Sequence, residues 1–410
     1  MEGNQSKPEL YVEKKTMINK SSEIKKYHIE TLGCQANERD SESIAGILES
    51  SGIMRADSFD NADVIVINTC SVRQKSEDKA YGFGKGILRL KNSGRSPFVI
   101  MSGCLVGSTK GERVRFDFNE LQTRVPWVDV FISPTEIREL PHILLNHKII
   151  ENIDLGINLK EHELAVRGKG KSAFVNIATG CDNFCTFCVV PYARGQETSR
   201  SKEDILEEIN HLVKVGYEHI TLVGQNVNSW GLSKDIKFQI RSGSDFNLPF
   251  EDLLRSVHEI EGVKKMSFIS SNPFDFTLGL IDALTLSKMD NYLHIAIQSG
   301  NDEVLKRMNR RHTVEEFKKL ITLIKKAKPH LAIGTDIIVG FPGETREQFL
   351  DTVELVKWAK FSVAYIAMYS PRKGTVAQKF FKDDVERDEK KWRHSHLTQV
   401  FEENKPNYRW

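Results

Sequence analysis

Short apolar runs alternate with amphipathic stretches along nearly all of this 410-residue chain, and this alternation constrains the fold more than any other feature. Strands that alternate with helices are typical of a parallel α/β sheet. Over residues 26–150 the predicted strands are Tyr27–Leu32, Val64–Asn68, Phe98–Met101 and Val128–Ile132. The predicted helices between them are Glu38–Ser50 and Glu77–Leu90. We therefore expect an N-terminal domain built on an open parallel sheet.

A second series of strands and helices spans residues 172–383. Its predicted strands are Ala173–Ala178, His219–Val223, Lys265–Ile269, Leu293–Ile297, Ile333–Val339 and Val363–Met368. Six repeats are too few for the eight of a closed barrel, so the sequence predicts an open partial (β/α)6 barrel.

The remaining segments lack this alternation. Residues 1–25 have no hydrophobic period and are predicted to be a disordered tail. Residues 151–171 carry few large apolar side chains and are predicted to be a linker, and residues 384–410 form a charged C-terminal segment with a helical beginning.

The nearly balanced overall charge does not by itself indicate a protein that binds nucleic acid. Lys and Arg number 58 against 56 Asp and Glu, so any surface that binds nucleic acid must be local. The sequence shows no secretory signal and no uncharged apolar run of about 18 residues, so we expect no membrane span. A reducing, cytoplasmic location is expected, in which six cysteines favour metal binding over disulfides.

Three of the six cysteines lie within eight residues, in the pattern CxxxCxxC formed by Cys181, Cys185 and Cys188. Tetrahedral zinc and closed iron–sulfur clusters take four protein ligands, and no fourth Cys or His lies nearby in the sequence. A [4Fe–4S] cube held by three thiolates keeps one iron open. The alternatives are a zinc knuckle that lacks a ligand and three unrelated buried thiols, which this density of cysteines disfavours.

The other three cysteines, Cys34, Cys70 and Cys104, are far apart in sequence, but each directly follows a predicted strand of the N-terminal domain. The carboxyl ends of parallel strands form one edge of a sheet. We therefore expect these cysteines to converge. Three unrelated core cysteines are the alternative.

Seven motifs are distributed along the chain beyond residue 26: Thr31-Leu-Gly-Cys-Gln-Ala-Asn37, Asn68-Thr-Cys-Ser-Val-Arg73, Gly180 to Gly195, Gln225-Asn-Val-Asn228, Gln298-Ser-Gly300, Met308-Asn-Arg310 and Asp336-Ile-Ile-Val-Gly-Phe-Pro-Gly-Glu344. In these motifs the chain resembles the radical-SAM methylthiotransferases, and among them the MiaB type. The Gln-Asn-Val-Asn stretch favours the MiaB type over its relatives.

The resemblance implies two [4Fe–4S] clusters and S-adenosylmethionine (SAM). The implied ligands are Cys181, Cys185 and Cys188 for the cluster that binds SAM, and Cys34, Cys70 and Cys104 for an auxiliary cluster. The implied reaction places sulfur and methyl at C2 of N6-(dimethylallyl)adenosine at position 37 of tRNA, beside the anticodon. It uses two SAM per turnover, one for the 5′-deoxyadenosyl radical that takes hydrogen from C2 and one for the methyl group.

Further residues are weaker candidates for binding SAM or substrate. They are Phe187, Arg194, Gln225, Asn226, Asn228, Gln298, Ser299 and Gly340. Most follow barrel strands, where catalytic groups gather in such folds. Packing is the alternative for Phe187, and turn capping for the Gln-Asn-Val-Asn stretch.

Four basic pairs are candidates for contacts with phosphates, with a solvated surface as the alternative. They are Lys306-Arg307, Arg310-Arg311, Arg372-Lys373 and Lys390-Lys391.

The implied partners are a tRNA anticodon stem-loop and an electron donor such as flavodoxin or ferredoxin, with a sulfur donor that the sequence does not identify. A monomer is expected. Family members end in a TRAM domain that binds tRNA, and this chain ends at Trp410, so we expect that domain to be missing or truncated. The alternatives are action on threonylcarbamoyl-adenosine in tRNA, action on a ribosomal-protein aspartate, and a cluster-bearing relative without catalysis. The presence of all six cysteines argues against the last.

We predict that anaerobic reconstitution loads about eight irons per chain, because each of two cubes holds about four. A colorimetric iron assay measures this number. A value near four would remove the auxiliary cluster from the interpretation.

Overall fold

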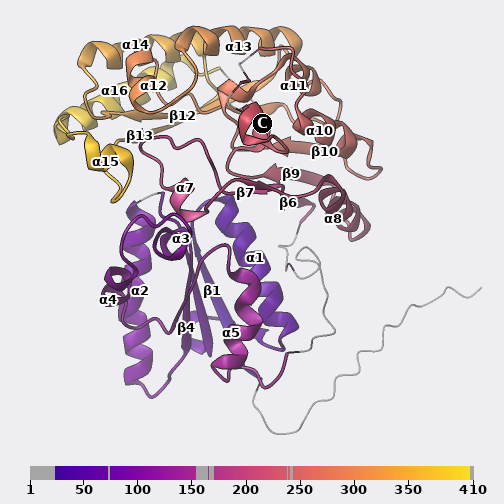
Figure 1. Cartoon of the computed structure of the whole chain (residues 1–410), viewed down its shortest axis with the longest axis vertical. Helices are drawn as coiled ribbons and strands as arrows, with labels where there is room; N and C mark the ends of the chain where they lie inside the picture. Colours follow the sequence, from indigo (N-terminus) through magenta and orange to yellow (C-terminus); the bar gives the residue numbers. More distant parts are fainter. Residues whose placement is uncertain are drawn as a thin grey trace, which may run out of the picture.

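Two α/β domains are stacked end to end in the computed structural model (Figure 1). The residues it describes are 24–72, 74–153, 165, 170–237, 239–240 and 243–406. The predicted tail, except for its last two residues, and most of the predicted linker lie outside these ranges.

The N-terminal domain has a five-stranded, all-parallel sheet in the order β2-β1-β3-β4-β5. Its strands are β1 Lys26–Leu32, β2 Met54–Arg55, β3 Val64–Thr69, β4 Phe98–Gly103 and β5 Val130–Ile132. Its helices are α1 Gln35–Ser50, α2 Gln74–Asn92, α3 Cys104–Lys110, α4 Phe118–Arg124 and α5 Leu140–Asn146, with short 3-10 turns at Phe59–Asn61 and Ile137–Glu139. The predicted open parallel sheet is confirmed.

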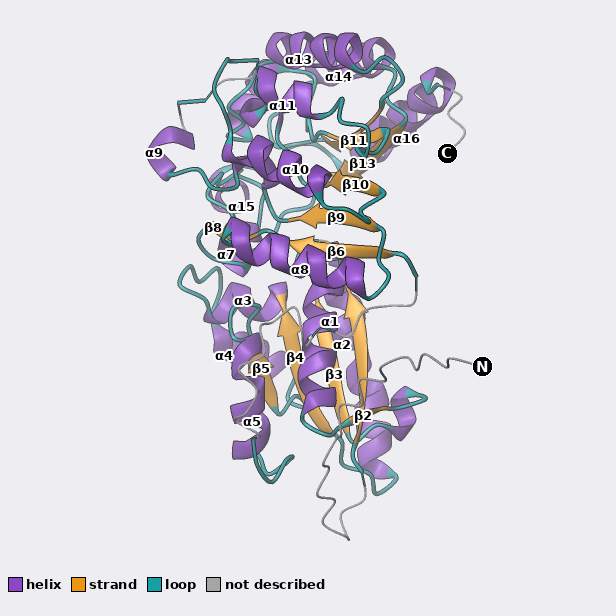
Figure 2. Ribbon diagram, turned by 90° about the vertical axis from the view of Figure 1, so that its right-hand side faces the viewer, coloured by secondary structure: helices purple, strands orange, loops and turns teal. Residues whose placement is uncertain are grey.

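The register of the three central strands aligns their carboxyl ends. Leu32 pairs with Thr69, and Thr69 pairs with Gly103. In Figure 2 these strands run toward the second domain, so their carboxyl ends face the domain junction. The strand β3 is buried on both faces, as expected for a parallel sheet covered by helices.

The second domain holds six parallel strands in chain order, in two three-stranded sheets. They are β6 Ser172–Asn176, β9 His219–Val223, β10 Lys265–Phe268, β11 Tyr292–His294, β12 Ala332–Val339 and β13 Val363–Met368. Isolated parallel bridges, Met266 to Met289 and Ser271 to Ile295, join the two sheets. The result is the open partial barrel that the six repeats predict.

The helices of the second domain are α8 Lys202–Lys214, α9 Lys234–Lys237, α10 Pro249–Glu259, α11 Leu278–Ala283, α12 Asp302–Arg307, α13 Val314–Ala327, α14 Arg346–Ala359, α15 Val376–Phe380 and α16 Arg387–Asn404, with 3-10 turns at Val227–Ser229 and Pro273–Asp275. The longer ones, α8, α10, α13, α14 and α16, cover the outside of the partial barrel (Figures 1 and 2). The short hairpin of β7 Ala178–Thr179 and β8 Thr198–Ser199 encloses the CxxxCxxC loop and the one-turn helix α7 Val190–Ala193.

The charged segment after residue 383 is part of the barrel rather than an appendage. Leu397, Val400 and Phe401 recur at helical spacing on α16 and are buried in the same core as the barrel strands. The helix packs against α14 and β13. Because most residues of α16 are charged or polar, the sequence pattern does not reveal this apolar stripe.

No helix in the described ranges has both the length and the apolar composition that a membrane crossing requires.

Gly103 is the last residue of β4 and directly precedes the helix that begins at Cys104, with φ of 96° and ψ of −164°. This conformation is essentially restricted to glycine. A Cβ atom at this position would lie 2.3 Å from the carbonyl oxygen of Thr69. The glycine therefore permits the close approach of the strand ends that precede Cys70 and Cys104.

We predict that Gly103→Ala lowers the free energy of unfolding by about 3 kcal/mol or more, since strain and a backbone clash add. Gly94→Ala is the matched control, because Gly94 also has positive φ, 85°, but has open space around it. It should cost about 1 kcal/mol. Urea unfolding followed by circular dichroism measures both values, and equal losses would contradict the role of the contact.

Candidate metal centre

The N-terminal cysteines meet at the carboxyl edge of the sheet. Cys34 lies at the N-terminal end of α1, Cys70 directly follows β3, and Cys104 begins α3. The pKa of the Cys104 thiol is raised to about 12, chiefly by burial; the nearby guanidinium of Arg194 lowers it, and the Cys70 and Cys34 thiols contribute to the increase. The structure thus brings together the three cysteines whose convergence we expected from their strand-end positions.

Two buried asparagines hold the loops that carry this set. The Nδ2 of Asn37 donates to Oδ1 of Asn68 at 2.9 Å, and the Nδ2 of Asn68 donates to the carbonyl oxygen of Asn37 at 2.8 Å. Asn37 also donates to the carbonyl oxygen of Thr69 at 3.2 Å. Paired amides of this kind satisfy buried polar groups and fix the loop after β1 against the end of β3.

The second set lies in the loop between β7 and α7. Burial raises the pKa of Cys188, and Cys185 and Cys181 raise it further, so these thiols also lie close together. The backbone N–H of Val190 donates to the Sγ of Cys188 at 3.4 Å. The Nη1 of Arg310 donates to the Sγ of Cys185 at 3.4 Å.

The donor chemistry of both sets suits iron–sulfur clusters, because thiolates are the ligands that such clusters take. No three His, Cys, Asp or Glu side chains in the described part of the chain could hold one metal ion. A cubane cluster places its thiolate ligands on different irons and so holds them farther apart. Buried thiols that repel each other's charge need cationic compensation to ionise, which bound iron would supply. The hydrogen bonds from Val190 and Arg310 favour the same thiolate form.

The two domains meet where the two cysteine sets lie. In Figure 1 the helix α3, which begins at Cys104, lies beside α7, which follows Cys188. A Cβ on Gly107 of α3 would lie 2.0 Å from the carbonyl oxygen of Ala193 in α7. Glycine therefore allows the backbones of the two helices to touch.

Ion pairs cross the same junction. Arg194, which is 5% exposed, pairs with Asp40 of α1 at 2.6 Å, and Arg113 pairs with Asp182 of the CxxxCxxC loop at 2.7 Å. Burial alone would lower the pKa of Arg194, but Asp40, Cys104 and Cys34 raise it well above its ordinary value. Arg194 thus places a permanent positive charge beside the N-terminal cysteines from the cluster loop of the other domain.

A third connection joins the end of β13 to the loop after Cys70. The Nε of Arg372 donates to the carbonyl oxygen of Ser71 at 3.2 Å, and its Nη1 donates to Oε1 of Gln74 at 2.6 Å. The Nη2 of Arg115 donates to the Oγ of Ser71 at 2.6 Å, and its Nη1 donates to the carbonyl oxygen of Lys373 at 2.8 Å. The barrel therefore supports the Cys70 loop directly.

The polar residues expected at the end of the second barrel strand are mostly engaged within the protein. Asn226 donates to Asp275 at 2.9 Å, and Asn228 donates to the carbonyl oxygens of Asn272 and Asp275 at 2.8 Å. Both are buried and tie two loops together, which matches the capping alternative. Gln225 is half-buried and makes no such bond to the described residues. Of the three, Gln225 is the one free to bind a ligand.

Among the other candidates, Phe187 and Ser299 also have partners within the protein, whereas Gln298 is distinguished by its backbone conformation. Phe187 packs against Phe341, with ring centroids 6.5 Å apart, which is the packing alternative. Gln298 lies in the segment that follows β11 and has φ of 75°, a strained conformation typical of functional sites. Ser299 is buried and caps the backbone N–H of Asn301.

The backbone at Gly340 is approached by protein. A Cβ there would lie 2.5 Å from Cγ of Lys390 on α16. The absence of a Cβ atom at Gly340 therefore allows α16 to pack against it. The approach of SAM to this glycine stays a prediction.

Most of the predicted phosphate-binding pairs have partners in the protein. Arg310 reaches Cys185, Arg311 pairs with Asp275, and Arg372 supports the Cys70 loop. Arg307 donates to the carbonyl oxygen of Gly343, and Lys390 pairs with Asp383. For Arg307, Arg310, Arg311 and Lys390, clustered charge in the sequence therefore reflects contacts inside the protein.

Sequence reasoning missed Asp40, Asp182 and Arg113. These residues come from separate domains and carry no local motif, so nothing along the chain indicates that they pair across the junction.

We predict that Asp40→Ala lowers the free energy of unfolding by about 3 to 5 kcal/mol, because it leaves the buried guanidinium of Arg194 without its counter-charge. Glu38→Ala is the control, since Glu38 is exposed on the same helix and should cost less than about 1 kcal/mol. Denaturant unfolding measures the difference. The double variant Asp40→Leu with Arg194→Leu should recover part of the loss, and equal costs for Asp40→Ala and Glu38→Ala would contradict the prediction.

Known families match both domains. Residues 175–356 match the Radical SAM superfamily, and residues 26–132 match the uncharacterized protein family UPF0004. A solved structure of the radical S-adenosylmethionine methyltransferase TsrM from Kitasatospora setae, with cobalamin and a [4Fe–4S] cluster bound, has a TM-score of 0.59 at 12% identity and covers 87% of this chain and 74% of its own. At this identity the likeness shows the fold alone.

Curated relatives are much closer in sequence. A Clostridium botulinum (strain Hall) protein is 40% identical over 387 residues, which cover 93% of this chain and 82% of the relative. A Thermoanaerobacter (strain X514) protein is 39% identical over 86% of this chain and 72% of the relative. Both are named tRNA-2-methylthio-N(6)-dimethylallyladenosine synthase. With its cysteine sets facing one junction and this identity over nearly its whole length, the chain belongs to the family of radical-SAM methylthiotransferases named tRNA-2-methylthio-N(6)-dimethylallyladenosine synthases.

Proposed function

We propose that this chain is a tRNA methylthiotransferase. It replaces the hydrogen at C2 of N6-(dimethylallyl)adenosine, at position 37 beside the anticodon, with a methylthio group. The observation that carries the proposal is the domain junction, where two three-cysteine sets adjoin across the ion pair of Arg194 and Asp40. One set alone would suit many radical reactions, whereas two suit hydrogen removal and sulfur transfer at one base.

The cofactors are two [4Fe–4S] clusters and SAM, two molecules per turnover. When bound, they supply the one-electron chemistry, the sulfur-binding metal site and the methyl group, none of which an acid–base side chain can supply. The proposed ligands are Cys181, Cys185 and Cys188 for the cluster that binds SAM and Cys34, Cys70 and Cys104 for the auxiliary cluster.

The protein's own part is to position and enclose the base. Arg194 and Asp40 fix the distance between the two sets, and the contact of Gly107 with Ala193 prevents the domains from sliding. Because the pair is buried, it also keeps water out of this part of the junction. A base must be unstacked to enter such a site, which is easiest in a single-stranded loop such as the anticodon loop.

Polar side chains line the barrel on the side away from its helices. The hydroxyls of Thr221 and Ser267 lie 2.8 Å apart, and Nε2 of His294 lies 2.7 Å from Oδ2 of Asp336. Their strand neighbours pack into the helix-covered core, so these groups face the opposite side. We propose that they, with Gln225 and Gln298, provide hydrogen bonds for the base or for SAM.

The remaining partners follow from the chemistry. Reductive cleavage of SAM needs one electron each time, so we propose a small electron-transfer protein such as flavodoxin or ferredoxin as the donor. A monomer holds both cysteine sets and therefore suffices for activity. Its tRNA substrate implies a cytoplasmic location.

We predict different losses for two cysteine variants of the reconstituted enzyme. Cys185→Ala should abolish SAM cleavage, whereas Cys70→Ala should keep 5′-deoxyadenosine formation and lose the methylthio product. Liquid chromatography with mass spectrometry measures both products, the second as a gain of about 46 Da on the base. A methylthio product from Cys70→Ala would show that the auxiliary set is assigned wrongly.

The substrate is tested in parallel. The enzyme is offered an anticodon stem-loop with N6-(dimethylallyl)adenosine, the same stem-loop with threonylcarbamoyl-adenosine, and ribosomal protein. We expect the gain on the first alone. A gain confined to either of the others would replace the proposed substrate.

A further inference from the structure

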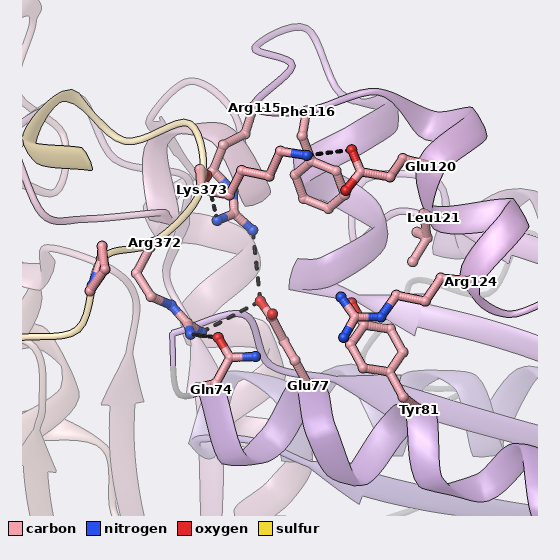
Figure 3. Close-up of a pocket in the computed structure, with 11 residues that line it drawn as sticks. Gln74, Glu77, Tyr81, Arg115, Phe116, Glu120, Leu121, Arg124, Arg372 and Lys373 are labelled. Atoms are coloured by element: carbon pink, nitrogen blue, oxygen red, sulfur yellow. Dashed lines mark hydrogen bonds and ion pairs between the residues drawn. The ribbon is translucent and has the colours of Figure 1, made fainter. Parts of the chain in front are cut away.

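A cavity of about 170 Å³ lies where the N-terminal domain meets the barrel, on the side of α2 and α4 (Figure 3). Its walls come from these two helices, from the segment before α4, and from residues 371–373 after β13. Nothing in the reaction described above uses it. It nevertheless adjoins the Cys70 loop, because Ser71 is bound by both Arg115 and Arg372 of its lining.

The lining carries more positive than negative charge. Four of its side chains are basic and two are carboxylates, an excess of two positive charges in a space open to solvent on one side. The basic residues are Arg115, Arg124, Arg372 and Lys373, and the carboxylates belong to Glu77 and Glu120.

Two arginines at the inner side share one carboxylate. Arg115 and Arg372 lie 3.7 and 3.4 Å from Oε1 of Glu77, and their side chains are 3% and 7% exposed. Burial and the repulsion of Arg372 lower the pKa of Arg115, although Glu77 opposes this. The buried Nε of Arg115 has no hydrogen-bond partner within the described structure. The inner side is thus short of negative charge.

The mouth combines cations with aromatic rings. The guanidinium of Arg124 lies over the ring of Tyr81, 3.8 Å from its centroid, and the ammonium of Lys373 lies 5.7 Å from the ring centroid of Phe116. Lys373 also pairs with Glu120. Arg124 is exposed and makes no ion pair with any residue that the structure describes.

We propose that this cavity binds a phosphodiester group of the tRNA loop whose base enters the domain junction. An arginine-rich pocket matches the geometry of a phosphate, and guanidinium groups over aromatic rings are typical of contacts with single-stranded RNA. The volume is large enough for a phosphate group. Its place beside the Cys70 loop puts the RNA backbone next to the auxiliary cysteines while the base lies between the two sets. The inference rests on the proposed tRNA substrate.

The test compares the binding of a fluorescent anticodon stem-loop to reconstituted enzyme variants at several salt concentrations, by anisotropy. Arg124→Ala should weaken binding about fivefold or more and lower the slope of log affinity against log salt by about one, because one phosphate contact is lost. Arg124→Lys should retain most of the slope. Arg124→Glu should weaken binding further than Arg124→Ala.

Arg89→Ala is the matched control, since Arg89 is an exposed arginine on α2 that pairs with Asp60 away from the cavity. It should leave affinity and slope unchanged. Iron content and melting temperature, compared with the unmodified enzyme, establish that each variant is folded.

Equal affinity and slope for Arg124→Ala and Arg89→Ala would overturn the inference. So would binding of inorganic phosphate that depends on Arg124 while RNA affinity does not, because the cavity would then serve a free anion. If the unmodified enzyme forms no methylthio product on any stem-loop, the proposed function itself fails. If it forms the product but the Arg124 variants bind the stem-loop as the unmodified enzyme does, only the further inference fails.

Discussion

The buried ion pair of Arg194 and Asp40 is the interaction on which the arrangement of the two domains depends. A guanidinium that is 5% exposed has lost most of its hydration, and a carboxylate at 2.6 Å offsets that loss in a single geometry. Since Arg194 follows the CxxxCxxC loop and Asp40 lies on the helix that begins after Cys34, the same geometry sets the spacing of the two cysteine sets. Because the two charges must remain paired, they hold the two domains in one relative position.

The close approach of backbone segments around this ion pair also fixes the positions of the two cysteine sets. Gly103 lets two strand ends approach closely enough for Cys70 and Cys104 to share a site, and Gly107 lets α3 touch α7. A Cβ atom at either position would clash with a backbone carbonyl oxygen, so any other residue would push these elements apart. The junction therefore joins rigid backbone segments, which suits a reaction in which two reactive centres must reach one base.

Much of the architecture follows from local patterns. The alternation of apolar runs with amphipathic helices predicted the central strands to within a few residues, and the positions of Cys34, Cys70 and Cys104 after strands predicted their convergence, because parallel strands end at one edge. The two-residue strand β2 was too short to show a period, and the high charge of α16 concealed the stripe of Leu397, Val400 and Phe401. Asn226 and Asn228 show the limit for polar motifs, since a loop amide that holds a fold has the same sequence as one that binds a ligand.

The sequence by itself determined the class of fold, the two cysteine sets and the family resemblance, because each depends on spacing within a short stretch of chain. The tertiary structure alone decided how the sets are held together and which basic residues remain available. Arg310 and Arg311 are equivalent in the sequence to exposed cations, yet folding places a thiol beside the first and a carboxylate beside the second. Pairing of charges across a domain junction depends on distances in space, and no pattern along the chain encodes them.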